Sequence, residues 1–179
     1  MLCLTRATNI LSFYGGETAD HRHRYLRDIQ QWPDDRLEET HDYIQWVFPL
    51  AEPSGFNPHA PILDQSSIRE FRLRSDLQEN LRISLLRMLA FYGFSINGET
   101  LCTVELGPHF AEKSALWMHP ANHNHLRIRR ILKSMQLLGP VAPVRSFFDC
   151  LAEIYRVERA RELPGISDET FSLWQKAGR

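Results

Sequence analysis

The sequence lacks the features that would place it in a disulfide-rich, metal-stapled or repetitive class of protein. It has only three cysteines, Cys3, Cys102 and Cys150, which are odd in number, far apart and without a Cys-x-x-Cys spacing. This pattern argues against a disulfide framework or a thiolate zinc site and fits a reducing cytosol. No internal repeat or low-complexity segment is visible, which argues against a repeat architecture.

An excess of charge of one sign and long hydrophobic runs are lacking too. The chain has 21 Lys and Arg against 22 Asp and Glu, a formal net charge of -1, so nothing draws it globally to nucleic acid or lipid. The most apolar run, Leu85–Phe94, is short and contains Arg87, whereas a bilayer span needs about 20 apolar residues. The N-terminal stretch has no clear cleavage site, so we expect no signal peptide and a cytoplasmic protein.

What is present is typical of one globular domain covering residues 1–179. Hydrophobic residues make up 43% of the 179-residue chain, which is enough to bury a core without cross-links. Apolar residues recur at helical spacing, and the pattern predicts an all-α fold, a single irregular domain of about seven or eight helices. The expected helices cover about residues 20–31, 40–48, 67–73, 75–92, 109–117, 124–138, 143–159 and 167 onward, with a helical turn at 34–39.

Two segments between these helices have distinct sequence signals. Asn97-Gly98 is a turn dipeptide typical of a β-hairpin. A small hairpin near residues 94–104 is therefore one interpretation, and irregular structure is the other, because two strands alone are marginally stable. The segment Leu50–Gln65 contains three prolines and a glycine, which predicts a long loop. Loops of this length inside a small domain are usually functional or mobile.

The first candidate site lies at the start of the helix expected at 124–138. His123 and Asn124 precede Arg127 and Arg130, which are three residues apart on one face. A helix N-terminus and guanidinium groups together suit a carboxylate or another anion. The alternative is that Asn or His caps the helix, while the basic residues pair with the acidic patch between Asp34 and Asp42.

The second candidate is the aromatic segment Tyr43, Trp46 and Phe48. Aromatic side chains next to the side-chain amide of Gln45 can form the walls of a peptide site. Large apolar side chains are more often buried, so the alternative is a core wedge that holds the proline-rich loop.

Catalytic and metal-binding motifs are not found in the sequence. Nucleophile, phosphate-loop and zinc-protease patterns do not occur. His119, His123 and His125 lie close in sequence, but Pro120 interrupts the helix that would align them and no acid lies nearby. We therefore expect neither a cofactor nor a metal.

Several stretches together resemble the conserved N-terminal domain of the opioid growth factor receptor family. They lie between about residues 25 and 139, and residues 140–179 form the C-terminal helices outside them. The matching stretches are Tyr25–Asp28, Asp35–Pro53, Asn57 with Ala60-Pro61, Met88–Gly93 and His123–Gly139. The resemblance implies a receptor-like domain, since animal members are described as non-classical receptors for an enkephalin pentapeptide, found near the nuclear envelope. It adds Asn57 to the candidate ligand-binding residues.

Three functional hypotheses follow. The first is a non-enzymatic module that binds a small peptide or another carboxylate-bearing ligand through His123, Asn124, Arg127 and Arg130, with aromatic walls. The second is an enzyme of unrecognised class in which His123 acts as acid or base beside Arg127. The third, nucleic-acid binding through the basic residues between Arg127 and Lys133, is disfavoured by the neutral net charge. The sequence does not indicate an oligomeric state.

Overall fold

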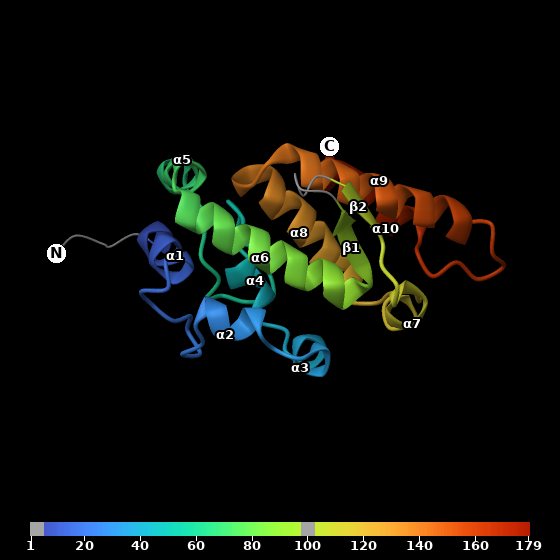
Figure 1. The fold of residues 1–179 in the computed structure, drawn as a ribbon, viewed down its shortest axis with the longest axis horizontal. Helices are drawn as coiled ribbons and strands as arrows, with labels where there is room; N and C mark the ends of the chain where they lie inside the picture. Colours follow the sequence, from blue (N-terminus) through green and yellow to red (C-terminus); the bar gives the residue numbers. More distant parts are fainter. Residues whose placement is uncertain (1–5, 98–102) are drawn as a thin grey trace. The chain divides into compact units, whose positions relative to one another are not determined.

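The structure, a computed structural model, describes residues 6–97 and 103–179. These residues form ten α-helices and one antiparallel pair of strands (Figure 1), which confirms the expected all-α fold. The hairpin interpretation of the 94–104 segment is also confirmed, because β1 (Phe94–Asn97) pairs with β2 (Thr103–Leu106). The Asn97-Gly98 turn itself lies outside the described residues.

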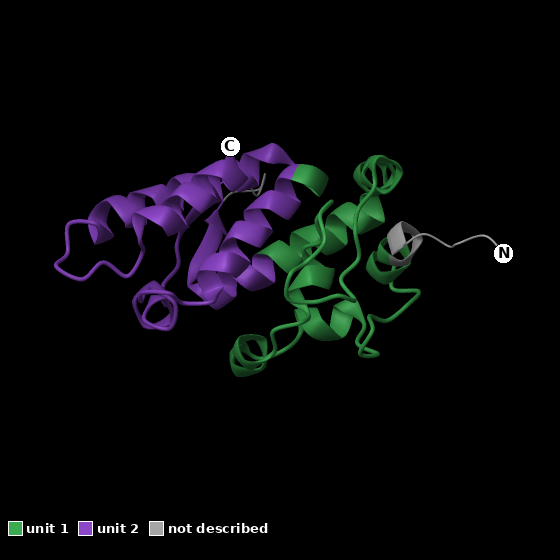
Figure 2. Ribbon diagram, turned by 180° about the vertical axis from the view of Figure 1, so that it is seen from behind, with its two compact units in different colours: residues 1–85, 137–139 green, residues 86–136, 140–179 purple. Residues whose placement is uncertain are grey.

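The chain divides into two compact units, coloured separately in Figure 2. Unit 1 comprises Met1–Leu85 and Leu137–Gly139, and unit 2 comprises Leu86–Gln136 and Pro140–Arg179. The helices in chain order are α1 (Arg6–Tyr14), α2 (Leu26–Gln30), α3 (Asp34–Glu39), α4 (Ile44–Val47), α5 (Gln65–Leu73), α6 (Ser75–Tyr92), α7 (Phe110–Ser114), α8 (Asn124–Leu138), α9 (Val141–Glu158) and α10 (Asp168–Gly178). That the whole chain forms one domain stays a prediction.

The helix expected at 20–31 is much shorter than predicted. Only Leu26–Gln30 is helical, because the carboxylate of Asp20 accepts hydrogen bonds from the backbone amides of Arg22 and Arg24. His23 adopts a left-handed conformation with φ of 61°, which interrupts any helix. The sequence pattern also gave no indication of α1, so the described helices number ten rather than seven or eight.

Aromatic side chains form much of the core of unit 1. Tyr14 is fully buried, donates a hydrogen bond to the carbonyl of Val47, and lies edge-on to Phe71 at 4.8 Å between ring centroids. Asn80 on α6 donates to the Tyr14 carbonyl at 2.7 Å. Edge-on pairs of this kind stabilise a core beyond the area they bury. These contacts join α1, α4, α5 and the first half of α6.

Two helix starts illustrate how far capping follows from the sequence. A serine before the last helix suggests a cap, and the Ser167 side chain accepts a hydrogen bond from the amide of Thr170 at 3.1 Å. After the proline-rich loop, Ser67 suggests a cap in the same way. Instead Asp64 is the N-cap of α5 and accepts from the Ser67 amide at 2.7 Å. A carboxylate at this position also complements the helix dipole, which favours Asp over Ser.

In unit 2 the hairpin and the last two helices pack together. α9 contacts both β2 and α10. The amide of Val104 donates to the hydroxyl of Ser146 on α9 at 2.7 Å, which fixes the second strand on the helix. The rings of Tyr155 and Phe171 stack at 4.0 Å and join α9 to α10. The hairpin is therefore stabilised by tertiary packing, which two strands in water lack.

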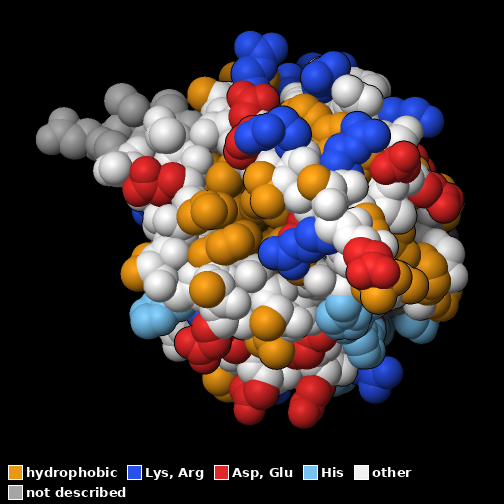
Figure 3. Space-filling view, turned by 90° about the vertical axis from the view of Figure 1, so that its right-hand side faces the viewer, with side chains coloured by type: hydrophobic (Ala, Val, Ile, Leu, Met, Phe, Trp, Pro, Cys, Tyr) orange, Lys and Arg blue, Asp and Glu red, His pale blue; other side chains and the backbone are white. Residues whose placement is uncertain are grey.

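Charges of both signs are mixed on the face of the protein shown in Figure 3. The face shown in Figure 3 carries basic and acidic side chains, with hydrophobic ones between them. A face of mixed sign does not provide the continuous basic stripe that binds phosphates. No helix among the described residues is long and apolar enough to cross a bilayer.

Gly93 ends α6 in a conformation that only glycine adopts easily, and it provides the first test of the fold. Gly93 has a φ of 90°, and a Cβ there would lie 2.8 Å from the Cα of Phe110. Gly16 has a φ of 77°, but a Cβ there would have nothing within 4 Å. Replacing Gly16 by alanine therefore measures the cost of the left-handed backbone conformation without a steric clash. We expect urea denaturation to show a loss of about 1 kcal/mol for Gly16→Ala. Gly93→Ala is expected to lose at least about 2 kcal/mol. Equal losses would show that the close approach to Phe110 does not constrain this helix end.

Candidate functional site

The candidate site in unit 1 begins with a tight turn before α2. Asp20 is buried, and its Oδ1 accepts from the backbone amides of Arg22 at 2.8 Å and Arg24 at 3.0 Å. Its other oxygen accepts from Nε of Arg24 at 2.7 Å. A buried carboxylate needs such donors, because an unpaired charge in the interior is costly. The hydrogen bonds to the buried Asp20 carboxylate therefore fix the conformation of this turn.

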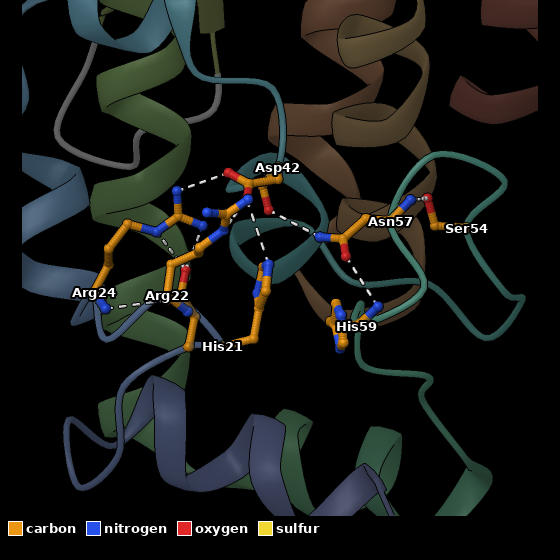
Figure 4. Close-up of polar contacts among 8 residues, drawn as sticks. His21, Arg22, Arg24, Asp42, Ser54, Asn57 and His59 are labelled. Carbon is orange, nitrogen blue, oxygen red and sulfur yellow. Dashed lines mark hydrogen bonds and ion pairs between the residues drawn. The ribbon is translucent and has the colours of Figure 1, made fainter.

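Asp42, which precedes α4, faces this turn from another segment of the chain (Figure 4). Its carboxylate accepts from Nη1 of Arg24 at 2.7 Å and from Nε of Arg22 at 3.2 Å, and Nε2 of His21 lies 3.4 Å away. Partial burial opposes ionisation of Asp42, but the hydrogen bond from Arg24 and the charge interactions with Arg24, His21 and Arg22 together outweigh it and keep the pKa of Asp42 below the usual value. The negative charges of Asp20 and Asp42 are balanced by the positive charges of Arg22 and Arg24, so the cluster carries no net charge when His21 is neutral.

Three aromatic rings lie in a row beside these charges. The ring of His21 stacks on Trp46 at a centroid distance of 6.0 Å and on His59 at 5.0 Å, each pair with an interplanar angle of 17°. Phe13 lies edge-on to Trp46 at 5.3 Å and closes the inner end of the row. Because Trp46 is buried and His59 is exposed, this row of rings leads from the core of unit 1 to its surface.

Three polar atoms in and next to the row are buried without a hydrogen-bond partner. They are Nδ1 of His21, Nε1 of Trp46 and Oε1 of Gln45. The Asp42 carboxylate only accepts hydrogen bonds, so a neutral His21 carries its proton on the Nε2 that faces it, and Nδ1 is left as an acceptor. Burial of the ring lowers the pKa of His21 and outweighs the opposing attraction of Asp20 and Asp42.

The loop that carries His59 is fixed to the same cluster by Asn57. The side-chain amide of Asn57 donates to the carbonyl of Asp42 at 3.0 Å, and its Oδ1 accepts from the amide of His59 at 2.9 Å. The hydroxyl of Ser54 accepts from the amides of Phe56 and Asn57, both at 3.2 Å. Asn57 is 4% exposed, whereas Phe56 is 84% exposed. The loop is thus anchored at its base and projects a phenyl ring.

Four of the predicted site residues lie in unit 1. Tyr43, Trp46 and Phe48 are buried, and Tyr43 lies edge-on to Trp32 at 5.5 Å. Their burial agrees with the core-wedge alternative. Asn57 holds the loop rather than facing solvent. A direct role of these residues in ligand binding stays a prediction.

The other four predicted residues lie in unit 2, at the start of α8. Asn124 is fully buried, and its amide donates to Oδ1 of Asn122 at 2.8 Å, so Asn122 caps the helix as the alternative interpretation expected. Oδ1 of Asn124 accepts from Nη1 of Arg127, which is also buried, at 3.1 Å. His123 and Arg130 are half-buried. Their role as an anion site stays a prediction.

His125 has a structural position that its sequence neighbourhood does not reveal. It is buried, and its Nε2 donates to the carbonyl of Trp117 at 2.9 Å. Its own carbonyl accepts from Nε1 of Trp174 on α10 at 2.8 Å. Burial lowers the pKa of His125, and this outweighs the hydrogen bond to Trp117. A neutral His125 therefore joins two buried tryptophans of unit 2.

The described residues show no group of three or more His, Cys, Asp or Glu side chains placed to hold a metal ion. The histidines that are close in sequence around α8 have separate partners. Nε2 of His119 lies 2.7 Å from the side-chain amide of Asn122, and Nε2 of His125 bonds the Trp117 carbonyl.

The cluster of His21, Asp42 and His59 could not be found from the sequence. These residues are about 20 positions apart, so no local spacing brings them together. Asp42 stands out in the sequence only as part of an acidic patch. The one available signal was that Asp42 and Asn57 both lie in stretches that match the family.

The anchoring role of Asn57 can be tested with two substitutions. Asn57→Ala removes both side-chain bonds and leaves the Asp42 carbonyl and the His59 amide without them, so we expect a loss of about 1–3 kcal/mol in the free energy of unfolding. Asn57→Asp retains an acceptor for His59 but not the donor to Asp42. We expect faster exchange of the His59 amide in the alanine variant only, measured by hydrogen exchange. Similar exchange in both variants would contradict this assignment.

The lowered pKa of His21 predicts an acid-sensitive unit 1. The folded protein holds His21 neutral, so below about pH 6.5 the unfolded chain binds more protons than the folded one. The stability that neutral His21 contributes is therefore fully present above about pH 6.5. It is lost as the pH falls toward the lower pKa that His21 has in the folded protein. We expect urea denaturation between pH 7.5 and 5 to show a shallower decline for His21→Gln than for the unsubstituted protein. Identical slopes would show that His21 does not contribute.

The comparisons with known proteins identify the family. The model of the opioid growth factor receptor conserved region matches residues 5–156. The opioid growth factor receptor of Homo sapiens is 36% identical over 161 residues, covering 87% of this chain and 23% of the relative. The Mus musculus receptor is 38% identical over 148 residues, covering 77% and 23%. The opioid growth factor receptor-like protein 1 of Xenopus tropicalis is 34% identical over 113 residues, covering 62% and 22%.

The chain thus spans about a quarter of the length of these relatives. No solved structure matches it. The match covers both units and includes the stretches that carry Asp42, Asn57 and α8. The chain belongs to the opioid growth factor receptor family.

Proposed function

We propose that this chain is a peptide-binding module that acts by binding rather than by catalysis, and that it contacts its ligand through the loop of residues 54–59. The names of the relatives support the first part, because they describe receptors for a growth factor. The second part rests on one observation. Phe56 is 84% exposed on a loop whose backbone is held by Ser54 and Asn57.

A single exposed hydrophobic side chain is ordinary on a protein surface. Phe56 differs because its own amide bonds Ser54, and the amides of His59 and Ala60 bond Asn57, so the backbone that carries the ring is fixed. A fixed loop loses little conformational entropy when a partner binds, so more of the interaction energy appears as affinity. Aromatic residues held in this way commonly dominate binding energy.

Charged groups next to the loop supply polar contacts for a peptide. The Asp42 carboxylate is 28% exposed and the Arg22 side chain is 68% exposed, and they lie 3.2 Å apart. A peptide over Phe56 therefore has an aromatic contact with a charged pair at its side, the usual arrangement of an apolar centre and a polar rim.

In unit 2 we propose a separate carboxylate site at the start of α8, which binds independently of the loop in unit 1. His123 and Arg130 are half-buried and so retain a surface that a ligand reaches. Asn124 and Arg127 bond each other below them and orient this end of the helix. We assign ligand contact to the first pair and support to the second.

The test is calorimetric titration with an enkephalin pentapeptide, which has aromatic side chains and a free carboxylate. We expect Phe56→Ala to weaken binding at least tenfold, as loss of an aromatic anchor does. Leu73→Ala is the matched control, because Leu73 is 87% exposed in the same unit but lies at the end of α5. This control is expected to bind like the unsubstituted protein.

A second arm uses the same peptide with an amidated C-terminus. Weaker binding of the amide would support the separate carboxylate site at α8, and Arg130→Gln should remove the difference between the two peptides at that site. Absence of binding up to millimolar peptide would overturn the proposed function. Equal weakening by Phe56→Ala and Leu73→Ala would overturn the role of the loop.

A further inference from the structure

The row formed by Trp46, His21 and His59 has one closed end and one open end. At the inner end Trp46 is 3% exposed and meets the edge of Phe13. At the outer end His59 is exposed although one of its faces covers His21 at 5.0 Å (Figure 4). Solvent therefore reaches parts of His59 that do not face His21.

We propose that an aromatic side chain of the bound partner stacks on the outer face of His59 and extends this row by one ring. The inference rests on the proposed function and specifies the chemistry that the loop recognises. The two existing pairs are nearly parallel, each with an interplanar angle of 17°, so the outer face is aligned for a third parallel contact. Such ring pairs contribute about 0.5–1.5 kcal/mol beyond the area they bury.

The position of His59 is fixed before any partner arrives. Its amide donates to Oδ1 of Asn57 at 2.9 Å, and its ring rests on His21, which in turn lies against Trp46. Phe56 projects from the same loop three residues earlier. The loop therefore offers two rings, one projecting and one lying flat on the body of unit 1.

The neighbouring charges favour an aromatic ring over a cationic side chain. Asp20 and Asp42 are already paired with Arg22 and Arg24, so a partner's ammonium or guanidinium group would compete with these two arginines for the carboxylates. A neutral ring requires no counter-charge. It also tolerates a proton on His59, because a cation over an aromatic face is attractive.

The experiment compares four pentapeptides that differ only at the central position, Gly-Gly-Xaa-Gly-Gly, with Tyr, Phe, Leu or Arg at Xaa. Affinity is measured by titration, and the ring protons of His59 are followed by NMR. We expect the Tyr and Phe peptides to bind about threefold to tenfold more tightly than the Leu peptide. They should also shift the His59 ring protons upfield, because those protons would lie over an aromatic ring, and the Leu and Arg peptides should not.

Two variants separate stacking from other roles of His59. His59→Phe keeps a flat ring on His21 and is expected to retain the aromatic preference, whereas His59→Ala should bind the four peptides with nearly equal affinity. His109→Ala removes an exposed histidine of unit 2 and should change nothing. Loss of the preference in His59→Phe would overturn stacking.

The outcomes also separate this inference from the function on which it rests. If the peptides bind and Phe56→Ala weakens them all, but aromatic and Leu peptides bind equally, the loop binds peptides and the stacking inference is wrong. If none of the four peptides binds the unsubstituted protein at millimolar concentration, both are wrong.

Discussion

The pairing of Arg24 with two aspartates is the constraint on which the candidate site depends. Asp20 is buried, so it must be satisfied by donors, and the backbone amides of residues 22 and 24 together with the Arg24 guanidinium satisfy it. This fixes a non-helical turn in a segment that would otherwise continue α2. The same guanidinium reaches Asp42 and joins the turn to the start of α4. The Arg24 and Asp42 side chains are only 14% and 28% exposed, so this ion pair is partly shielded from water and links the turn to the segment before α4.

The position of the ring row follows from that pairing. His21 lies inside the turn, between Asp20 and Arg22, whose backbone amide Asp20 binds, and its ring stacks on Trp46 and on His59. The carbonyl of Asp42 in turn accepts the Asn57 amide that fixes the loop. One cluster of charges thus organises both the flat surface of His59 and the base of the loop that projects Phe56. A binding surface built in this way is pre-organised by the core and does not need to be ordered by its ligand.

The sequence predicted the long helices well and the site poorly, for physical reasons. α6, α8 and α9 have apolar stripes at helical spacing, and that pattern depends only on neighbours in sequence. The 20–31 segment has the same local pattern, but there Asp20 binds the backbone amides of Arg22 and Arg24 and forms a turn that overrides helical propensity. Arg24 also pairs with Asp42, which lies outside any local window of the sequence. The burial of Trp46 and Phe48 followed from size and hydrophobicity alone. His21 and His59 meet only because two loops converge, which local pattern cannot predict.

The network at the start of α8 shows why a polar cluster in sequence does not by itself define a ligand site. Oδ1 of Asn124 accepts from Tyr92 at 3.4 Å and from Arg127 at 3.1 Å, so the two lone pairs of that oxygen are already used within unit 2. Asn124 and Arg127 are buried, and a ligand that displaced either hydrogen bond would leave a buried donor or acceptor unsatisfied, at a free-energy cost comparable to the benefit of the new hydrogen bond. His123 and Arg130 are the members of the cluster that retain accessible surface, which is why the proposed ligand contact is assigned to them. The same reasoning applies in unit 1, where Ser54 and Asn57 hold the loop, whereas Phe56 and His59 are exposed.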